Sequence, residues 1–368
     1  MASPFLTNVA MLNPNLFFYI DRGRVILWDY EAQSQFDMDG EHLDALFKIV
    51  GGESGKVSQT IVNELHENNI LVENTALPQD WGWDRLAHIF HFGTQMPRHK
   101  EEDKQAIDES VYLEHCSTLA ETAPELHKTY KGPATALPDP DLEMLKGISL
   151  WEALFARMTS RQFGAGVLSL DILSTVLYAT FYAIHGDERK DTEDFGIRMI
   201  GYRRSSPSAG GLQSPEPYVL IRNVENIAAG LYHYSSRNHT LTLIGHSFDD
   251  VDLGRVLGGQ MWANEVSAGV FLTSSLKKLT WKYPHSRSYR DAYIDIGALL
   301  QTFQLTCAAF GISCWMTGYF LDREIDRLLG INCGEEISTF FIGVGAGKPQ
   351  PLSKKTMEIA AKPSQRKH

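Results

Sequence analysis

The stretch from Tyr202 to Tyr234 constrains the fold of this chain more than any other segment. It opens on Arg203 and Arg204, continues through a Pro-Ser-Ala-Gly-Gly turn, and enters a strand-like run at residues 218–221. Because glycine carries no Cβ, such a turn lets the backbone approach a flat or phosphorylated ligand closely. The preceding arginines supply planar donors for phosphate or carboxylate groups. The stretch therefore predicts either a surface β-hairpin with basic flanks or a ligand-binding turn before a strand.

The length and charge of the chain limit its class and its partners. Its 368 residues suffice for two domains, or for one large domain with an appendage. The formal net charge of −11 disfavours nucleic acid and anionic membranes, because both attract positive protein surfaces. The four cysteines form no Cys-x-x-Cys pair, and no signal peptide or transmembrane-length segment is recognisable. We therefore expect a cytoplasmic protein with reduced thiols, and neither nucleic acid nor a membrane as partner.

Residues 1–75 are the first of four predicted regions. Two strand-like runs, two helical patterns and a closing strand follow one another there, at residues 16–20, 25–28, 41–50, 57–69 and 70–72. This order predicts a small winged-helix-like module. The region holds four Lys or Arg residues against eleven Asp or Glu residues, which argues against DNA binding. Peptide docking or stabilisation of a dimer fits this charge better.

Residues 76–148 are predicted as a helical and linker segment. His88 and His91 lie three residues apart in a helical pattern there, but two ligands alone do not make a metal site, so we predict none. Residues 131–140 are rich in Pro and Ala and are predicted as a loop. The rest of the chain is divided into a second domain and a tail, at residues 149–350 and 351–368.

Long apolar runs predict the core of the second domain. The runs at 268–273 and 337–347 are typical of buried strands, and the run at 291–310 predicts a helix that is buried all round, as in a core or at a dimer interface. Glycines in the 337–347 run imitate part of a dinucleotide-binding fingerprint. No helix with an acidic residue follows them, so we predict no Rossmann fold.

The end of a predicted helix carries a second candidate ligand site. Arg157, Thr159 and Arg161 follow one another at alternate positions there. Two guanidinium groups and a hydroxyl within four residues suit a phosphate, because guanidinium is always charged and donates hydrogen bonds in a fork. The residues alone leave two interpretations open, a phosphate site and a solvated helix end.

Taken together, these motifs resemble the SagB-type dehydrogenases, the FMN-dependent branch of the nitroreductase superfamily. That branch has Arg-x-x-Pro-Ser-x-Gly-x-Leu, then a Glu-x-Tyr strand, then Gly-Leu-Tyr-x-Tyr. One departure follows the leucine, where the family has an aromatic residue or His and then Pro, and this chain has Gln213 and Ser214 before Pro215. The matching residues are Arg204, Pro207, Ser208, Gly210, Leu212, Glu216, Tyr218 and the run 230–234.

The resemblance implies an α+β nitroreductase fold, with a mostly antiparallel sheet flanked by helices, in a homodimer that holds FMN at its interface. An Arg-x-Ser-x-Arg/Lys-x-Phe motif holds the FMN phosphate and ribityl chain in this family, and this chain has Thr159 in place of the serine. A later loop presents backbone N–H groups to the flavin N5 edge. The implied FMN contacts are Arg157, Thr159, Arg161, Arg204, Pro207, Ser208, Gly210, Gln213, Thr317 and Gly318.

Lys282 and Tyr283 are the candidate catalytic residues. The dipeptide alone carries little information, but azoline-oxidising members of the resembling family have Lys-Tyr at this place. A nearby ammonium lowers the pKa of a tyrosine, so Tyr283 could accept a carbon-bound proton. The resemblance then implies oxidation of a thiazoline or oxazoline in a peptide or carrier-bound intermediate, with hydride passing to flavin N5 and O2 reoxidising the flavin. A biosynthetic partner protein is expected at the N-terminal module.

Three other functions stay open at this point. The same fold could serve a NAD(P)H-dependent reductase of nitro or quinone compounds, since the nicotinamide stacks over the flavin in that superfamily and needs no Rossmann motif. The same flavin geometry could oxidise an amine or a C–C bond beside a carbonyl. A scaffold protein that has lost its flavin is the alternative without enzymatic activity.

Overall fold

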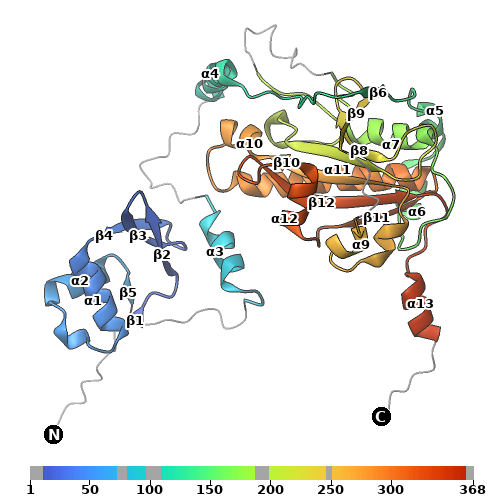
Figure 1. The fold of residues 1–368 in the computed structure, drawn as a ribbon. Helices are drawn as coiled ribbons and strands as arrows, with labels where there is room; N and C mark the ends of the chain where they lie inside the picture. Colours follow the sequence, from blue (N-terminus) through green and yellow to red (C-terminus); the bar gives the residue numbers. More distant parts are fainter. Residues whose placement is uncertain (1–10, 73–80, 97–108, 187–198, 246–250, 362–368) are drawn as a thin grey trace. The chain divides into compact units, whose positions relative to one another are not determined.

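The computed structural model describes residues 11–72, 81–96, 109–186, 199–245 and 251–361. The chain divides into two compact units, Met1–Lys104 and Gln105–His368, and each is described by itself (Figure 1). None of the helices within the described ranges is both long enough and apolar enough to span a bilayer.

The N-terminal unit has the strands and helices predicted for residues 16–72, and adds two strands and a 3-10 helix that were not predicted, β1, β4 and η1. β2 and β3 form a hairpin whose turn residues Arg22 and Gly23 have positive φ angles of 46° and 81°. Asp39 and Ser58 cap the two helices that follow, with their side chains accepting from backbone N–H groups. Its elements are β1 Met11–Leu12, β2 Leu16–Asp21, β3 Arg24–Asp29, β4 Ser34–Met38, α1 Gly40–Val50, η1 Ser54–Lys56, α2 Gln59–Glu67, β5 Leu71–Val72 and α3 Arg85–Gly93.

The second unit is built on a seven-stranded sheet with the order β11-β12-β10-β7-β8-β9-β6. Every neighbouring pair in this sheet is antiparallel. The predicted α+β fold with an antiparallel sheet is therefore confirmed. The strands are β6 Ala134–Ala136, β7 Pro215–Ile221, β8 Gly230–Ser235, β9 Thr240–Gly245, β10 Ala268–Ser275, β11 Ser313–Thr317 and β12 Glu336–Gly345.

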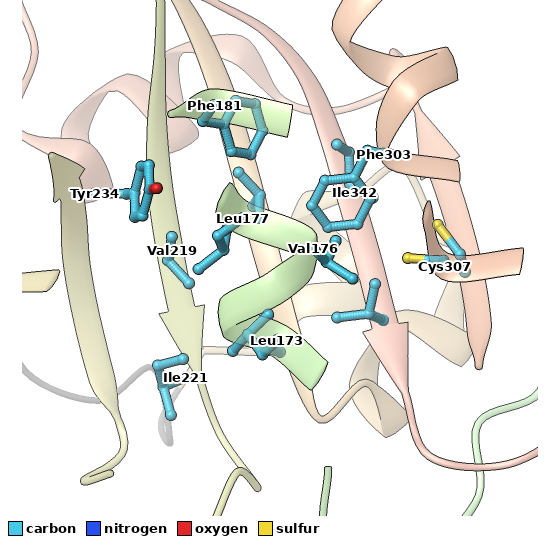
Figure 2. Packing of buried hydrophobic residues seen from close by; sticks show 14 of the residues in the cluster. Leu173, Val176, Leu177, Phe181, Val219, Ile221, Tyr234, Phe303, Cys307 and Ile342 are labelled. Atoms are coloured by element: carbon cyan, nitrogen blue, oxygen red, sulfur yellow. The ribbon is translucent and has the colours of Figure 1, made fainter. Parts of the chain in front are cut away.

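Helices cover both faces of this sheet, so its central strands are apolar on both sides. Along β7, Val219 and Ile221 face one core, whereas Tyr218 and Leu220 face the other. Figure 2 shows the first core, where α7 and α11 pack side by side against the sheet. The helices are α4 Glu109–Leu119, α5 Leu142–Gly147, α6 Leu150–Ala156, α7 Leu170–Phe181, α9 Leu253–Val256, α10 Leu276–Lys282, α11 Ser288–Ala309, α12 Asp322–Leu329 and α13 Lys354–Ala361.

Two parts of the second unit differ from the sequence-based expectation. Residues 131–140, predicted as a loop, contain the edge strand β6, which pairs with β9 at three positions and so joins the sheet. Helix α11 was expected to be buried all round, but Tyr293 and Ile294 are 44% and 66% exposed. Its apolar sequence therefore supplies both a core face and an outward apolar face.

Candidate functional site

The turn after Arg204 forms the wall of a cavity of about 470 Å³. The turn is the short 3-10 helix η4, Ala209–Gly211, in which Gly210 has a φ of 59°. Gln213, just after it, is buried and has a φ of 49°, so this backbone is held in a conformation that side chains rarely adopt. The cavity is lined by His185, Tyr202, Arg203, Arg204, Ser205, Ser206, Pro207, Ser208, Gly211 and Gln213.

The Lys282–Tyr283 pair lies directly against this turn. Both residues are at the C-terminal end of α10, where Tyr283 is the cap residue. A Cβ on Gly210 would lie 2.6 Å from the Tyr283 hydroxyl oxygen and 3.2 Å from Lys282 Nζ. Only glycine therefore permits this approach, and the structure brings three residues singled out from the sequence into one place.

Asp295 on α11 holds the turn in place, and sequence reasoning missed it. Ser208 Oγ donates to Asp295 Oδ2 at 2.5 Å, and the Ala209 N–H donates to Oδ1 at 3.0 Å. The Gln213 N–H in turn donates to Ser208 Oγ at 2.9 Å. Burial raises the pKa of Asp295, against these hydrogen bonds. The sequence did contain a signal for it, because Asp295 is an acidic residue inside the mostly apolar helical run 291–310.

Arg204 shapes the cavity from inside the protein. Its guanidinium donates to the carbonyl oxygens of Phe181 and Pro215 at 2.9 and 3.1 Å. It also donates to Tyr202 Oη at 2.9 Å and Ser236 Oγ at 2.8 Å. These contacts join α7, β7 and the loop after β8. A contact of Arg204 with a cofactor stays a prediction.

Arg157, Thr159 and Arg161 lie in the loop after α6, all half-buried. A reciprocal capping box between Ser149 and Glu152 fixes the start of α6, and Arg157 caps its end. The loop is hydrogen-bonded to two other segments: the Ser160 N–H donates to the Cys314 carbonyl at 2.8 Å, and Arg161 donates to the carbonyls of residues 350 and 351 at 2.7 and 2.9 Å. This loop is thus fixed beside the start of β11.

Thr317 and Gly318 lie at the other end of β11. Thr317 Oγ1 accepts from Gln260 Nε2 at 2.9 Å and from the Tyr319 N–H at 3.0 Å, so the turn after the strand is closely held. Thr317 lies four residues beyond Ser313, or about 13 Å along an extended strand. The predicted phosphate-binding loop and the predicted N5 loop are therefore at opposite ends of one strand.

The environment of Tyr283 differs from the one expected from its neighbour. Burial raises the pKa of Tyr283, and a hydrogen bond from Tyr112 on α4 opposes that rise. Lys282 Nζ lies over the ring of Tyr283, 5.7 Å from its centroid. Tyr112 and its hydrogen-bonded neighbour Cys116 were not predicted, because they belong to the segment interpreted as a linker.

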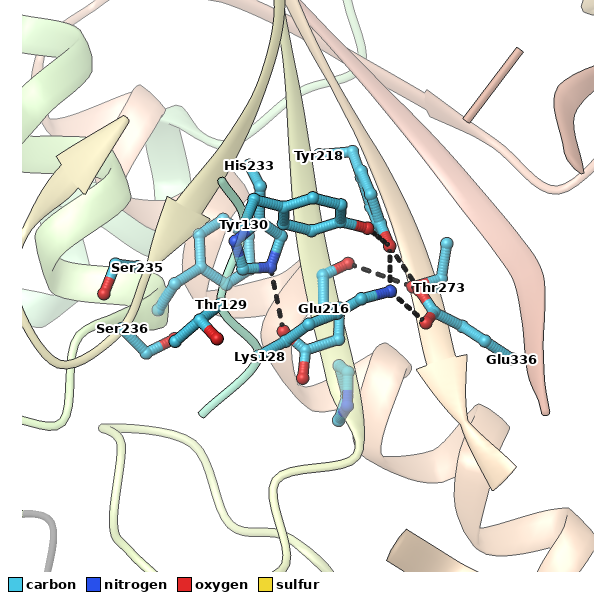
Figure 3. A network of polar contacts seen from close by, with 12 residues as sticks. Lys128, Thr129, Tyr130, Glu216, Tyr218, His233, Ser235, Ser236, Thr273 and Glu336 are labelled. Atoms are coloured by element: carbon cyan, nitrogen blue, oxygen red, sulfur yellow. Dashed lines mark hydrogen bonds and ion pairs between the residues drawn. The ribbon is translucent and has the colours of Figure 1, made fainter. Parts of the chain in front are cut away.

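Two buried ionic clusters lie beside the sheet strands next to the cavity (Figure 3). In the first, Glu216 accepts from Lys278 Nζ at 2.6 Å and contacts His233 Nε2 at 3.1 Å. Burial opposes ionisation of Glu216, but Lys278 and His233 outweigh it and hold the pKa of this carboxyl well below its usual range. Lys278 also donates to the Gln213 carbonyl at 3.3 Å, which ties the cluster to the cavity wall.

The second cluster centres on the Tyr218 hydroxyl. It donates to Glu336 Oε1 at 2.7 Å and accepts from Lys128 Nζ at 2.6 Å. Lys128 also pairs with Glu336 Oε2 at 2.6 Å, and Thr273 donates to Oε1 at 2.5 Å. Burial raises the pKa of Tyr218 far above its ordinary value, so it stays protonated and acts as a donor. The cluster fastens the segment before β6 to the sheet.

The fold and the comparisons with known proteins together define the class. A helix-flanked antiparallel sheet of this kind is that of a nitroreductase-type oxidoreductase, a superfamily that generally binds FMN. The sequence profile of the nitroreductase family matches residues 154–346, and the chain belongs to this family.

Individual relatives are distant. A Methanocaldococcus jannaschii protein described as a nitroreductase is 25% identical over 192 residues, 52% of this chain and 88% of the relative. The trifolitoxin-processing protein TfxB of Rhizobium leguminosarum bv. trifolii is 23% identical over 273 residues, 71% of this chain and 68% of the relative. A crystal structure described as that of a nitroreductase from Anabaena variabilis superposes with a TM-score of 0.51 at 21% identity, covering 75% of this chain and 51% of that one. The match therefore spans about half of that structure.

Proposed function

We propose that this chain is an FMN-dependent oxidase that converts a thiazoline or oxazoline ring, in a peptide or carrier-bound intermediate, to the aromatic azole. The observation that carries the proposal is the contact of Lys282 and Tyr283 with the Gly210 turn. A half-buried tyrosine against the turn that bounds a ligand-sized cavity is suited to take a proton from carbon. The relative named as a trifolitoxin-processing protein supports a biosynthetic role.

The residues present fit FMN. The Arg157 guanidinium is half-buried, and no ion pair holds it in the part of the chain that the structure describes, so it is available for a phosphate. We assign the turns at Gly210 and Gly318 to the flavin together with Gln213, as the family resemblance implies. When bound, FMN would supply the acceptor for the electron pair that leaves the substrate carbon as hydride, with O2 as the final oxidant.

A second copy of the chain fits the exposed apolar side chains of α6 and α11. Trp151, Phe155 and Ile294 are 71%, 80% and 66% exposed, although the two helices pack together. Apolar side chains gathered in this way are costly in water and typical of an interface. We propose that this surface forms the homodimer, and that the FMN sites are completed by both copies.

The visible spectrum of the purified protein tests the flavin and the reaction class. We expect a yellow protein whose flavin absorbance persists after anaerobic addition of NADPH, and a mass of about twice 41.3 kDa in solution. Rapid bleaching by NADPH would instead favour a reductase of nitro or quinone compounds. We expect Arg157→Ala to release the flavin, and Arg323→Ala, at an exposed arginine of α12, to retain it. A protein that stays colourless after FMN is added would refute the proposal.

The N-terminal unit carries an apolar groove suited to a peptide. A cavity of about 250 Å³ lies between α1 and the edge strand β2. Phe47 and Val50 border it and are 72% and 68% exposed. An edge strand beside an apolar groove can accept an extended peptide, with main-chain hydrogen bonds giving affinity and side-chain pockets giving specificity. Because this unit is acidic, we propose that it binds an extended segment with alternating apolar and basic residues, carried by the substrate or a partner protein.

Phe47→Gln is expected to weaken the binding of such a peptide to the full chain by about tenfold, because the ring is the largest exposed apolar anchor of the groove. Fluorescence anisotropy with a labelled synthetic peptide of alternating apolar and basic residues measures the affinity. Gln59→Ala, at an exposed and uncharged position on α2, is the control and should change little. Equal affinities of the wild type and Phe47→Gln would exclude the groove as the docking site.

A further inference from the structure

Residues 109–130, here called the cover segment, lie beside α10, whose C-terminal end carries Lys282 and Tyr283. Tyr112 hydrogen-bonds with Tyr283, and Trp281 Nε1 donates to Thr122 Oγ1 at 3.2 Å. Further along, the His127 ring stacks on Tyr202, which lines the cavity, with centroids 4.4 Å apart. The cover segment therefore contacts both the catalytic pair and the cavity wall.

The cover segment is anchored at its far end as well. Lys128 joins the buried cluster of Tyr218 and Glu336 on the sheet, and Tyr130 Oη lies 2.9 Å from Tyr218 Oη. Breaking this cluster would leave buried charge unpaired, so the anchor resists displacement. Tyr112 thus reaches Tyr283 from a helix that is tied to the body of the unit and not from a free end.

The Tyr283 hydroxyl has neighbours from two other elements. The Gly210 backbone is one of its close neighbours, and Tyr112 on α4 is its hydrogen-bond partner. Once ionised, the Tyr283 oxygen can only accept a hydrogen bond, so Tyr112 is the donor to that form. The titratable groups around Tyr283 are Tyr112 and Cys116 from α4, Lys282 from α10, His285 from the following loop, and Asp291 and Asp295 from α11.

We propose that Tyr112 is a positioning residue that donates a hydrogen bond to the Tyr283 hydroxyl and stabilises the ionised form that accepts the substrate proton. This role rests on the proposed function of Tyr283 as the base. Tyr112 acts on the oxygen that must lose its own proton. The ionisation of Tyr283 therefore depends partly on the cover segment.

Nuclear magnetic resonance of the full chain, with carbon-13 at Cζ of its 14 tyrosines, tests the hydrogen bond without substrate or flavin. The resonance missing in Tyr283→Phe identifies Tyr283. In Tyr112→Phe we expect the titration midpoint of Tyr283 to rise by about half to one pH unit, the effect of losing one hydrogen bond to the charged form, and its neutral-pH resonance to shift. Glu114→Gln, at an exposed position of α4, should change neither.

The reciprocal variant gives an independent readout. Tyr283→Phe should lower the titration midpoint of Tyr112, because its acceptor is removed. A Tyr283 midpoint and neutral-pH resonance that are both unchanged in Tyr112→Phe would overturn the proposal. In that case azoline oxidation by the wild type would still support the proposed function of the chain. A protein that binds no flavin but shows the shifted Tyr283 midpoint in Tyr112→Phe would refute the proposed function and leave the hydrogen bond established.

Discussion

Glu216→Gln is expected to lower the free energy of unfolding of the second unit by about 3–5 kcal/mol, because it leaves a buried ammonium without its counter-charge. The side chains of Glu216 and Lys278 are only 5% and 3% exposed, and their atoms lie 2.6 Å apart. Glutamine keeps the shape of the side chain and can still accept a hydrogen bond. The loss therefore measures the unpaired charge and not a cavity.

Chemical denaturation followed by tryptophan fluorescence measures this change. The matched control is Glu335→Gln, which removes the ion pair to Lys277 on the same helix α10, where both partners are about half exposed. Exposed pairs of this kind contribute about 0–1 kcal/mol. The double variant Glu216→Leu with Lys278→Met should recover much of the lost stability, because neither charge is then buried. Equal effects of Glu216→Gln and Glu335→Gln would contradict the assignment.

The same pair gives a pH dependence with a defined sign. The folded-state pKa of Glu216 lies below its ordinary value of 4.5, so the folded state holds the charged form more strongly than the unfolded chain does. The stabilisation is present above that ordinary value and is lost as the pH falls through the folded-state pKa. We expect the wild type to lose stability more steeply in acid than Glu216→Gln does.

Local sequence patterns were sufficient for most of the fold. The apolar runs of β10 and β12 and the amphipathic patterns of α1 and α2 are signals contained within each element. Helix α11 shows the limit of this reasoning, because its composition is apolar throughout and does not tell the core face from the exposed face that carries Ile294. Which face is covered depends on elements far away in the chain.

The candidate site was predictable only where a motif is contiguous. The Gly210 turn and the Lys282–Tyr283 dipeptide could be singled out from the sequence, and the structure places them in contact. Asp295 lies 87 residues from Ser208, and the partners Tyr218 and Glu336 lie 118 residues apart, so no local pattern joins them. Tyr112 could not be singled out either, because it is far from Tyr283 in the sequence and lies in a segment whose composition resembles a linker.

The pKa of Tyr283 illustrates a second kind of limit. Adjacency in sequence suggested that the Lys282 ammonium lowers this pKa, yet the pKa lies above its ordinary value. Lys282 Nζ lies over the ring, and burial raises the pKa. The sign of the shift depends on burial and on groups from α4 and α11, which lie far from the dipeptide in the chain, so the dipeptide alone does not predict it.

Tyr283→Phe is expected to reduce azoline oxidation by about 100- to 10,000-fold, the range that positioned acid–base groups contribute, while FMN stays bound. The ring, its packing against Leu212 and Leu279, and the contact with Gly210 are retained, and only the hydroxyl is lost. Lys282→Ala should also abolish most of the activity, because it removes the ammonium that lies over the Tyr283 ring and beside the turn. Steady-state oxidation of a thiazoline peptide, with flavin content measured in each sample, tests both variants.

Lys277→Ala is the matched control for Lys282→Ala, since this lysine is on the same helix and its side chain is 60% exposed. It should keep nearly full activity. Raising the pH should not restore activity to Tyr283→Phe, because phenylalanine has no group to ionise. A variant that keeps Tyr283 but displaces it should regain activity as the hydroxyl ionises. Full activity in both Lys282→Ala and Tyr283→Phe, with flavin bound, would refute the roles assigned to this pair. It would then favour the reductase function over azoline oxidation.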